Sequence, residues 1–121
     1  MSAQRRAIIP KRGEVYLVNF DPTVGAEIKK TRPALVLQND IANEYSPIII
    51  VAAMSSKYDE KLLPTEILVH PPEGGIKLSS VVQLNQIRSV DKQRLIRKLG
   101  ELTEATMIEV NEAIQISLGL I

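Results

Sequence analysis

The pattern of apolar and polar positions along the chain predicts a mainly β protein. Six stretches are alternating or continuously apolar over the length of a strand, and turn-forming residues such as Asp-Pro, Pro-Pro and Gly-Gly separate several of them. The expected strands are residues 14–20, 33–38, 47–54, 65–70, 81–90 and 95–99. The third is rich in β-branched side chains, which favours a central place in a sheet.

Two helical segments are expected. A short helical turn over residues 41–44 follows the second strand, with Asn39 or Asp40 as its candidate cap. From Thr103, a candidate N-cap, the apolar spacing becomes helical. One apolar face of this helix contains Met107, Val110, Ile114, Leu118 and Ile121, and a second, roughly opposite patch contains Ala113, Ile116 and Leu120. One patch should cover the sheet, while the other fits either a subunit contact or a helix buried in a monomer.

These elements predict one small domain of mainly β (α+β) class, with a strongly bent antiparallel sheet or partial barrel and a C-terminal helix. A chain of 121 residues is long enough to bury one core. We expect residues 1–10 to form a flexible tail and residues 11–121 to form the domain.

The composition excludes some chemistry and suggests a location. The chain has no Cys, so disulfides, thiolate metal sites and cysteine catalysis are excluded. It contains no apolar stretch long enough for a signal peptide or a membrane span, which predicts a soluble cytoplasmic protein with no membrane partner. Residues 1–98 carry all 15 Lys and Arg against 10 acids, whereas residues 99–121 carry four Glu and no base. A basic body with an acidic end is compatible with a polyanion on one face or with an ordinary solvated helix.

Arg32 is the first candidate functional residue. It directly precedes Pro33, which biases it toward extended geometry at a strand end. A buried unpaired guanidinium is costly, so Arg32 should point toward an anion, either a protein carboxylate (Glu27 or Asp40) or a phosphate. Ser55, which ends the third apolar run, is by position alone an ordinary strand terminator.

Five segments occur in the order and spacing of a known family. They are residues 11–16 (KRGEVY), 21–27 (DP…GAE), 32–40 (RPALVLQND), 50–55 (IVAAMS) and 82–95 (VQLNQIRSVDKQRL). Together they resemble the MazF/PemK-type toxins, and the likeness runs from residue 11 to the end of the chain. The resemblance implies a small SH3-like barrel of the plasmid-maintenance-toxin type, which functions as a homodimer.

The resemblance also implies a function. It predicts a metal-independent endoribonuclease without a cofactor, the toxin of a type II toxin–antitoxin pair, which cuts single-stranded RNA at a short sequence. The catalytic residues would be Arg32, Ser55 and Glu27, with Ser55 standing where the family has threonine. Residues for RNA contact would be Asn39, Gln86 and Ser89. Lys29 and Arg88 are further RNA-binding candidates because of their charge, although solvated surface positions explain them equally well.

The proposed chemistry is attack of the ribose 2′-OH on its own phosphorus, which leaves a 2′,3′-cyclic phosphate and a 5′-OH. His70 is the one histidine and lies outside the five segments, so a two-histidine mechanism is excluded. Arg32 suits stabilisation of the phosphorane, and Glu27 is the candidate base for the 2′-OH.

Two other functions, and a protein partner, follow from the same residues. The chain could be a non-enzymatic CcdB-like toxin acting on a protein such as DNA gyrase, but that class ends in Trp-Gly-Ile and this chain ends in Leu118-Gly119-Leu120-Ile121. It could also be a non-catalytic nucleic-acid-binding barrel. The implied protein partner is a cognate antitoxin, which we expect to place an acidic, partly disordered segment in a basic groove.

Overall fold

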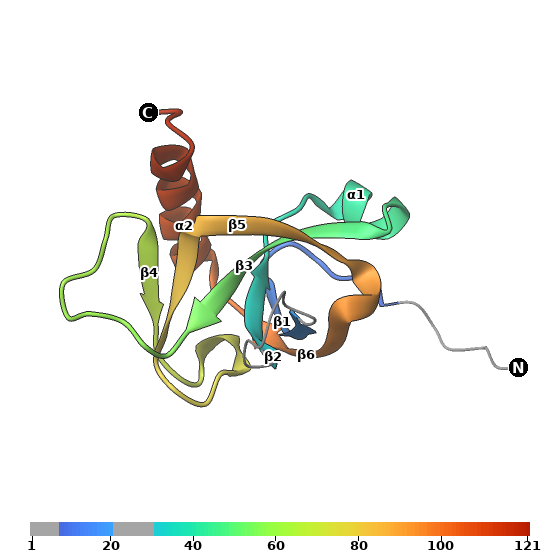
Figure 1. Ribbon diagram of the computed structural model, residues 1–121, viewed down its shortest axis with the longest axis horizontal. Coiled ribbons are helices and arrows are strands. Elements are labelled where there is room, and N and C mark those ends of the chain that lie inside the picture. The colour runs from blue at the N-terminus through green and yellow to red at the C-terminus, as the bar shows by residue number, and fades with distance from the viewer. Residues whose placement is uncertain (1–7, 21–30) are drawn as a thin grey trace, which may run out of the picture.

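The computed structural model describes residues 8–20 and 31–121, and all structural statements below concern these residues. Six strands occur in chain order, and each of the six segments expected to be a strand overlaps one of them (Figure 1). They are β1 (Glu14–Asn19), β2 (Thr31–Val36), β3 (Ile48–Ser55), β4 (Glu66–Val69), β5 (Ser80–Asp91) and β6 (Leu95–Glu101). The helices are α1 (Asp40–Tyr45) and α2 (Glu104–Ser117), with short 3₁₀ turns η1 (Glu73–Gly75) and η2 (Lys92–Arg94).

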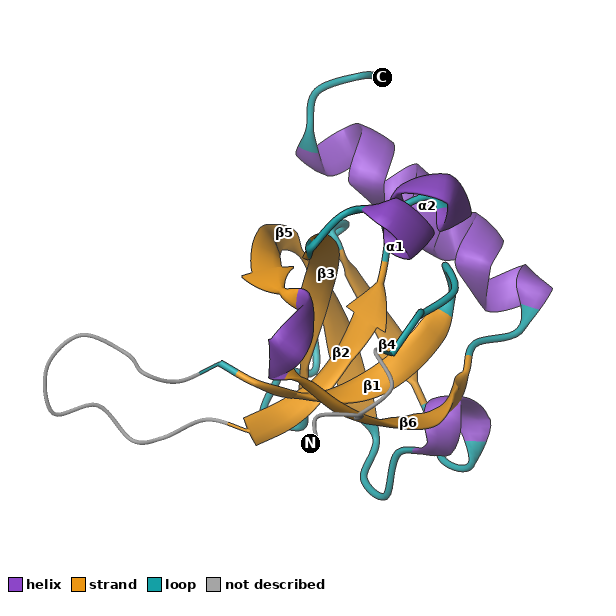
Figure 2. Ribbon diagram, turned by 90° about the vertical axis from the view of Figure 1, so that its right-hand side faces the viewer, coloured by secondary structure: helices purple, strands orange, loops and turns teal. Residues whose placement is uncertain are grey.

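The strands form one antiparallel sheet in the order β4-β5-β3-β2-β1-β6. The sheet is strongly bent, so that β3 and β5 lie on one side of the interior and β1 and β6 on the other (Figures 1 and 2). Register shifts in the β1–β6 and β3–β5 pairs accompany this curvature, as bulges generally do. The mainly β fold with a C-terminal helix is confirmed. Between the described residues, however, no ladder joins β4 to β6, so the hydrogen-bonded sheet does not close into a complete barrel.

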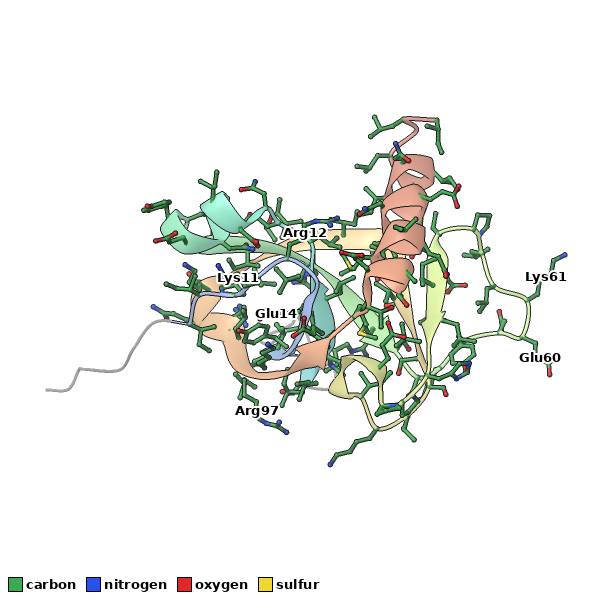
Figure 3. All side chains as sticks on the ribbon, turned by 180° about the vertical axis from the view of Figure 1, so that it is seen from behind. Lys11, Arg12, Glu14, Glu60, Lys61 and Arg97 are labelled. Atoms are coloured by element: carbon green, nitrogen blue, oxygen red, sulfur yellow. The ribbon has the colours of Figure 1, made fainter. Side chains whose placement is uncertain are left out.

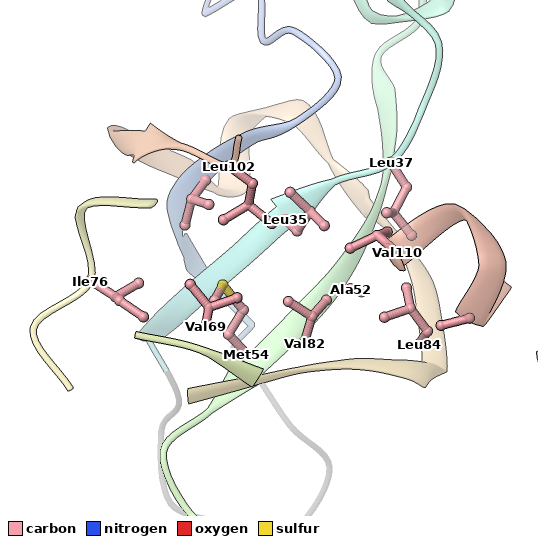
Figure 4. Packing of buried hydrophobic residues seen from close by; sticks show 12 residues of the cluster. Leu35, Leu37, Ala52, Met54, Val69, Ile76, Val82, Leu84, Leu102 and Val110 are labelled. Atoms are coloured by element: carbon pink, nitrogen blue, oxygen red, sulfur yellow. The ribbon is translucent and has the colours of Figure 1, made fainter. Parts of the chain in front are cut away.

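Two groups of buried side chains fill the two sides of the bent sheet. The first lies between the sheet and α2 and includes Leu35, Met54, Leu84 and Val110 (Figure 4). The second lies on the opposite face and includes Val18, Val36, Ile49 and Val51. β2 and β3 contribute to both groups because alternate residues of a strand point to opposite faces. This explains why these two strands are continuously apolar in the sequence.

The buried face of α2 differs from the predicted one. Val110 and Ala113 are buried, and Met107 and Ile114 pack against the same core. Leu118 and Ile121 follow the last helical residue and are 60% and 71% exposed. The prediction assigned Ala113 to the opposite patch and extended the core face to the end of the chain, and both assignments are wrong. The helix ends at Ser117, so the 3.6-residue periodicity does not apply beyond it.

A hydrogen-bonded clasp holds α1 to the end of β2. The Gln38 amide donates to Asn43 Oδ1 (3.1 Å) and to the Ile48 carbonyl (2.9 Å), while the Asn43 amide donates to the Gln38 carbonyl (2.8 Å). Asn43 is fully buried, so these bonds satisfy polar groups that water does not reach. Asp40 Oδ1 accepts from the Arg12 backbone amide (2.7 Å), which ties α1 to the start of the domain.

Arg12 connects the same region to α2. Its Nε donates to the Leu37 carbonyl (2.8 Å), and its Nη2 donates to Asn111 Oδ1 on α2 (2.6 Å) (Figure 3). Before Arg12 in the chain, Ile8 packs against the second core group and Pro10 is buried. The part of the predicted tail formed by residues 1–7 lies outside the described residues.

Candidate active site

Arg32 and Ser55 come together at one end of the sheet. Arg32 is the second residue of β2 and Ser55 is the last residue of β3. The β2–β3 ladder pairs Ala34 with Ala53, and the same register continued by two residues places Arg32 opposite Ser55. Both line one pocket of about 550 Å³. The two residues that carry most of the predicted chemistry therefore share a cavity large enough for part of a nucleotide chain.

The Ser55 hydroxyl closes a tight turn at the end of β3. Its Oγ accepts from the Lys57 backbone amide and donates to the Lys57 carbonyl, both at 3.1 Å. Ser55 therefore does end the strand, as its position in the sequence suggested. A hydroxyl oxygen has a second lone pair and its proton rotates, so the same turn also fixes Oγ at the edge of the pocket for a ligand.

The Arg32 guanidinium has no hydrogen bond or ion pair to any other described residue. Asp40, one of its two candidate structural partners, is engaged by Arg12 and Asn43 instead. Glu27, the other candidate partner and the predicted base, lies outside the described residues, as does Lys29. The described part of the pocket therefore leaves the Arg32 charge available to an anion.

Three further cationic side chains line this pocket and were not predicted as part of the site. They are Lys57 on the turn after Ser55, Lys77 on the loop after η1 and Arg97 on β6. No Asp or Glu is among the described residues that line the pocket. The cavity is consequently cationic as well as partly apolar, with Leu17, Met54, Ile76 and Leu99 among its apolar residues.

The loop that contributes Lys77 is held against β6 by glycine. Gly75 has φ +70°, in the left-handed region, and a Cβ there would lie 1.9 Å from the Leu99 carbonyl oxygen. η1 is also anchored to the start of α2, because Glu73 Oε2 accepts from the Thr103 amide (3.0 Å) and hydroxyl (3.2 Å). Burial opposes ionisation of Glu73, but its hydrogen bonds with Thr106 and Thr103 outweigh that effect and lower its pKa. The charged carboxylate therefore stabilises this side of the pocket.

The predicted RNA-contact residues lie away from the pocket. Ser89 is opposite Ile50 on β3, five residues from Ser55, which corresponds to about 17 Å along the strand. Asn39 is near the same end, since the backbone N–H of the adjacent Gln38 donates to the Ile50 carbonyl. Gln86 lies between the two ends on β5, and Gln86, Ser89 and Asn39 are all exposed. Within one protomer, the candidate catalytic residues therefore lie far from most of the candidate RNA-contact residues.

Asn39 and Arg88 also have structural roles. Asn39 Oδ1 accepts from the Ala42 amide (2.8 Å) and caps α1, so its amide NH₂ remains the part that could contact a base. The Arg88 guanidinium lies 4.9 Å from the centre of the Phe20 ring, a cation–π contact on the face of the second core group. His70 Nδ1 is 2.7 Å from Ser79 Oγ, outside the pocket lining.

Comparison with known proteins identifies the family. Residues 11–118 match the family described as the PemK-like, MazF-like toxin of type II toxin–antitoxin systems. The chain belongs to this family. It is 46% identical over 114 residues to the endoribonuclease EndoA of Bacillus subtilis, covering 94% of this chain and 98% of the relative. It is 43% identical over 110 residues to the endoribonuclease MazF of Staphylococcus epidermidis, covering 91% and 92%.

Solved structures of the MazF family agree with the fold. A MazE–MazF crystal structure from Deinococcus radiodurans superposes with a TM-score of 0.78 and 28% identity, covering 94% of this chain and 99% of that one. This MazF-family chain is therefore an endoribonuclease toxin, which decides against the CcdB-like and the non-catalytic alternatives.

Within the described residues, no helix is long and apolar enough to cross a membrane, and no three His, Asp or Glu side chains are grouped to hold a metal ion.

Proposed function

We propose that the chain cleaves single-stranded RNA in the cytoplasm at a short sequence, without a metal ion, by attack of a ribose 2′-OH on the adjacent phosphorus. The products are a 2′,3′-cyclic phosphate and a 5′-OH. The observation that carries this proposal is the shared pocket of Arg32 and Ser55, in which the described lining is cationic and contains no carboxylate. Such a lining favours binding of a phosphodiester.

Arg32 would hold the scissile phosphate and stabilise the charge that develops on its oxygens. Its planar fork matches two phosphate oxygens, and a protonated guanidinium has no lone pair free to accept a proton, so it acts as a charge and a hydrogen-bond donor rather than as a base. Ser55 would donate its hydroxyl proton to a phosphate oxygen in place of the Lys57 carbonyl. Glu27 is the proposed base for the 2′-OH, and the leaving 5′ oxygen takes its proton from Arg32 or from water.

RNA recognition is proposed to use Asn39, Gln86, Ser89, Lys29 and Arg88. Their amide and hydroxyl groups can hydrogen-bond to the edges of splayed-out bases, and their charges can follow phosphates. Because Ser89 lies about 17 Å along the sheet from Ser55, with Asn39 near the same end, a continuous RNA contact requires either several nucleotides or a second protomer. This spacing supports the proposed homodimer.

The proposed protein partner is a cognate antitoxin. One similar structure is described as an endoribonuclease in complex with its cognate antitoxin from mycobacterial species, and another is a MazE–MazF structure. For this chain we propose an acidic, partly disordered antitoxin segment that occupies the cationic pocket and competes with RNA.

The test is incubation of the purified protein with a long single-stranded RNA in EDTA, with mapping of the 5′ ends and of the end groups. The expected result is cleavage at a few sites that leaves 5′-OH and cyclic phosphate ends. Arg32→Ala should lower the rate by ~10²–10³, the scale for loss of one transition-state donor. Lys61→Ala, which removes a charge from the exposed β3–β4 loop, should leave the rate unchanged (Figure 3). Cleavage by a folded Arg32→Ala protein at the wild-type rate would show that Arg32 is not catalytic.

A further inference from the structure

The basic residues near β6 differ in how far the protein already uses them. Lys98 forms ion pairs with Glu14 (2.9 Å) and Glu101 (3.5 Å), and the hydrogen bond and charge of Glu14 raise the pKa of Lys98. Arg94 donates to the Asn19 carbonyl (3.2 Å), and Lys92 reaches the Glu44 carbonyl (3.5 Å). Arg97 makes no hydrogen bond or ion pair within the described part of the chain, although it is the member of this group that lines the pocket.

The sheet register fixes the position of Arg97 relative to Arg32. Leu17 of β1 is paired with Arg97 on one side and with Pro33, the neighbour of Arg32, on the other. Arg97 is therefore two strand spacings from Pro33, or about 10 Å at the backbone. By strand alternation Arg97 shares the face of Pro33, while Arg32 starts on the other face of β2, but both arginines line the same pocket at this end of the sheet. Two arginines placed in this way can hold neighbouring phosphates of a strand that passes around the end of the sheet.

The loop after η1 forms another wall of the pocket and adds a second charge to its lining. Lys77 lines the cavity two residues after Gly75, whose missing Cβ lets η1 approach the Leu99 backbone. Neither Lys77 nor Arg97 has a carboxylate partner among the described residues. The apolar side chains of Ile76 and Leu99 lie in the same lining. A ligand that suits this wall has an anionic part and a flat apolar part, as a nucleotide does.

We propose that Arg97 and Lys77 form a second phosphate-binding subsite, which holds the RNA backbone next to the phosphate that is cut. This inference rests on the proposed ribonuclease function and adds two positioning residues to it. They are assigned to substrate binding, because Arg97 lies two strands from β2 and Lys77 lies on the loop after η1, while Arg32 and Ser55 are neighbours at the proposed scissile phosphate.

Kinetics with Arg97→Gln and Lys77→Gln test the subsite, with Lys61→Gln as a control that makes the same change of charge elsewhere. Each subsite variant should raise KM about tenfold, the scale of one lost charge-assisted hydrogen bond, with kcat within about twofold of wild type. The slope of log K against log salt for RNA binding should become smaller by about 0.7 for each lost contact. Equal KM values for Arg97→Gln and Lys61→Gln would overturn the proposal.

A chemically modified substrate identifies the contacted phosphate. In a short RNA that contains one mapped cut site, each linkage next to that site is replaced in turn by an uncharged methylphosphonate. At one linkage the replacement should raise KM of the wild type, and the same replacement should cost much less in Arg97→Gln, because the partner charge is already absent. Equal costs in both proteins at every linkage would show that Arg97 contacts no single phosphate.

Binding separates this proposal from the ribonuclease function. The same RNA with a 2′-deoxy residue at the cut site cannot be cleaved, and its affinity can be measured by fluorescence anisotropy. Weaker binding by Arg97→Gln supports the subsite even if the wild type fails to cleave RNA, which would count against the proposed function alone. If Arg97→Gln binds this RNA as the wild type does but loses affinity for an acidic peptide of Glu and Asp, the surface serves a protein partner and the RNA subsite is wrong.

Discussion

Ser55 has a structural role and a proposed catalytic role, and both depend on its hydroxyl. Its Oγ closes the turn with Lys57 and is the proposed donor to the scissile phosphate. Ser55→Ala removes both, so we expect cleavage to fall by about 10²-fold and the free energy of unfolding to fall by about 1 kcal/mol. Ser55→Thr keeps the hydroxyl, restricts its rotation and should retain cleavage. Initial rates on one RNA, measured together with urea unfolding, check this expectation.

The neighbouring Ser56 is the comparison for this experiment, because it lines the same pocket and is exposed. Ser56→Ala should leave the cleavage rate and the stability close to those of the wild type. A large loss of rate in Ser56→Ala, with normal cleavage by Ser55→Ala, would move the assignment by one residue.

For single residues, the sequence predicted the site correctly where one short motif contains the functional residue. Arg32 was predicted because it precedes Pro33 at a strand end, and Ser55 because it ends an apolar run in a familiar motif. Lys77 and Arg97 carry no such local signal, since an exposed lysine or arginine has the same appearance on any surface. Their place in the pocket depends on the register of β1 with β6 and on the approach of η1.

At the level of the elements, the contact between η1 and β6 leaves no room for an added Cβ at Gly75. Gly75→Ala places a Cβ 1.9 Å from the Leu99 carbonyl oxygen and also occupies a left-handed φ of +70°. We expect it to reduce the free energy of unfolding by more than about 3 kcal/mol and to raise KM for RNA, because the backbone that carries Lys77 must move. Urea unfolding and RNA kinetics measure the two effects.

Gly119→Ala is a matched control for backbone strain. Gly119 has nearly the same φ, +73°, but a Cβ there would have no atom within 4 Å. Its cost should be limited to the left-handed conformation, about 1 kcal/mol. Equal destabilisation by the two substitutions would mean that the η1–β6 contact relaxes without loss.

The elements themselves were largely predictable, and the limits of the prediction have a physical reason. Alternation and apolar runs located the strands, because burial on one or both faces imposes those patterns. The end of α2 was not predicted, since Leu118, Leu120 and Ile121 continue an apolar pattern although they are exposed. Apolar residues that contact a partner and those that fill a core are alike in a single sequence.

For the whole molecule, the remaining question is what covers the exposed apolar side chains. Ile48 and Ile50 are 40% and 38% exposed and lie two residues apart, on the same face of β3. Ser89, a predicted RNA-contact residue, is opposite Ile50. A twofold contact on this face would bring candidate RNA-contact residues of two protomers together.

We therefore expect light scattering to give twice the 13.4 kDa of one chain at micromolar concentration. Ile50→Glu should shift the protein toward monomer and reduce cleavage in parallel, because a buried unpaired carboxylate is costly in an interface. Leu120→Glu makes the same change beyond the end of α2, where the side chain is 67% exposed. If Leu120→Glu dissociates the dimer and Ile50→Glu does not, the interface lies at the C-terminal end. A wild type that cleaves RNA normally as a monomer would show that one protomer carries a complete site.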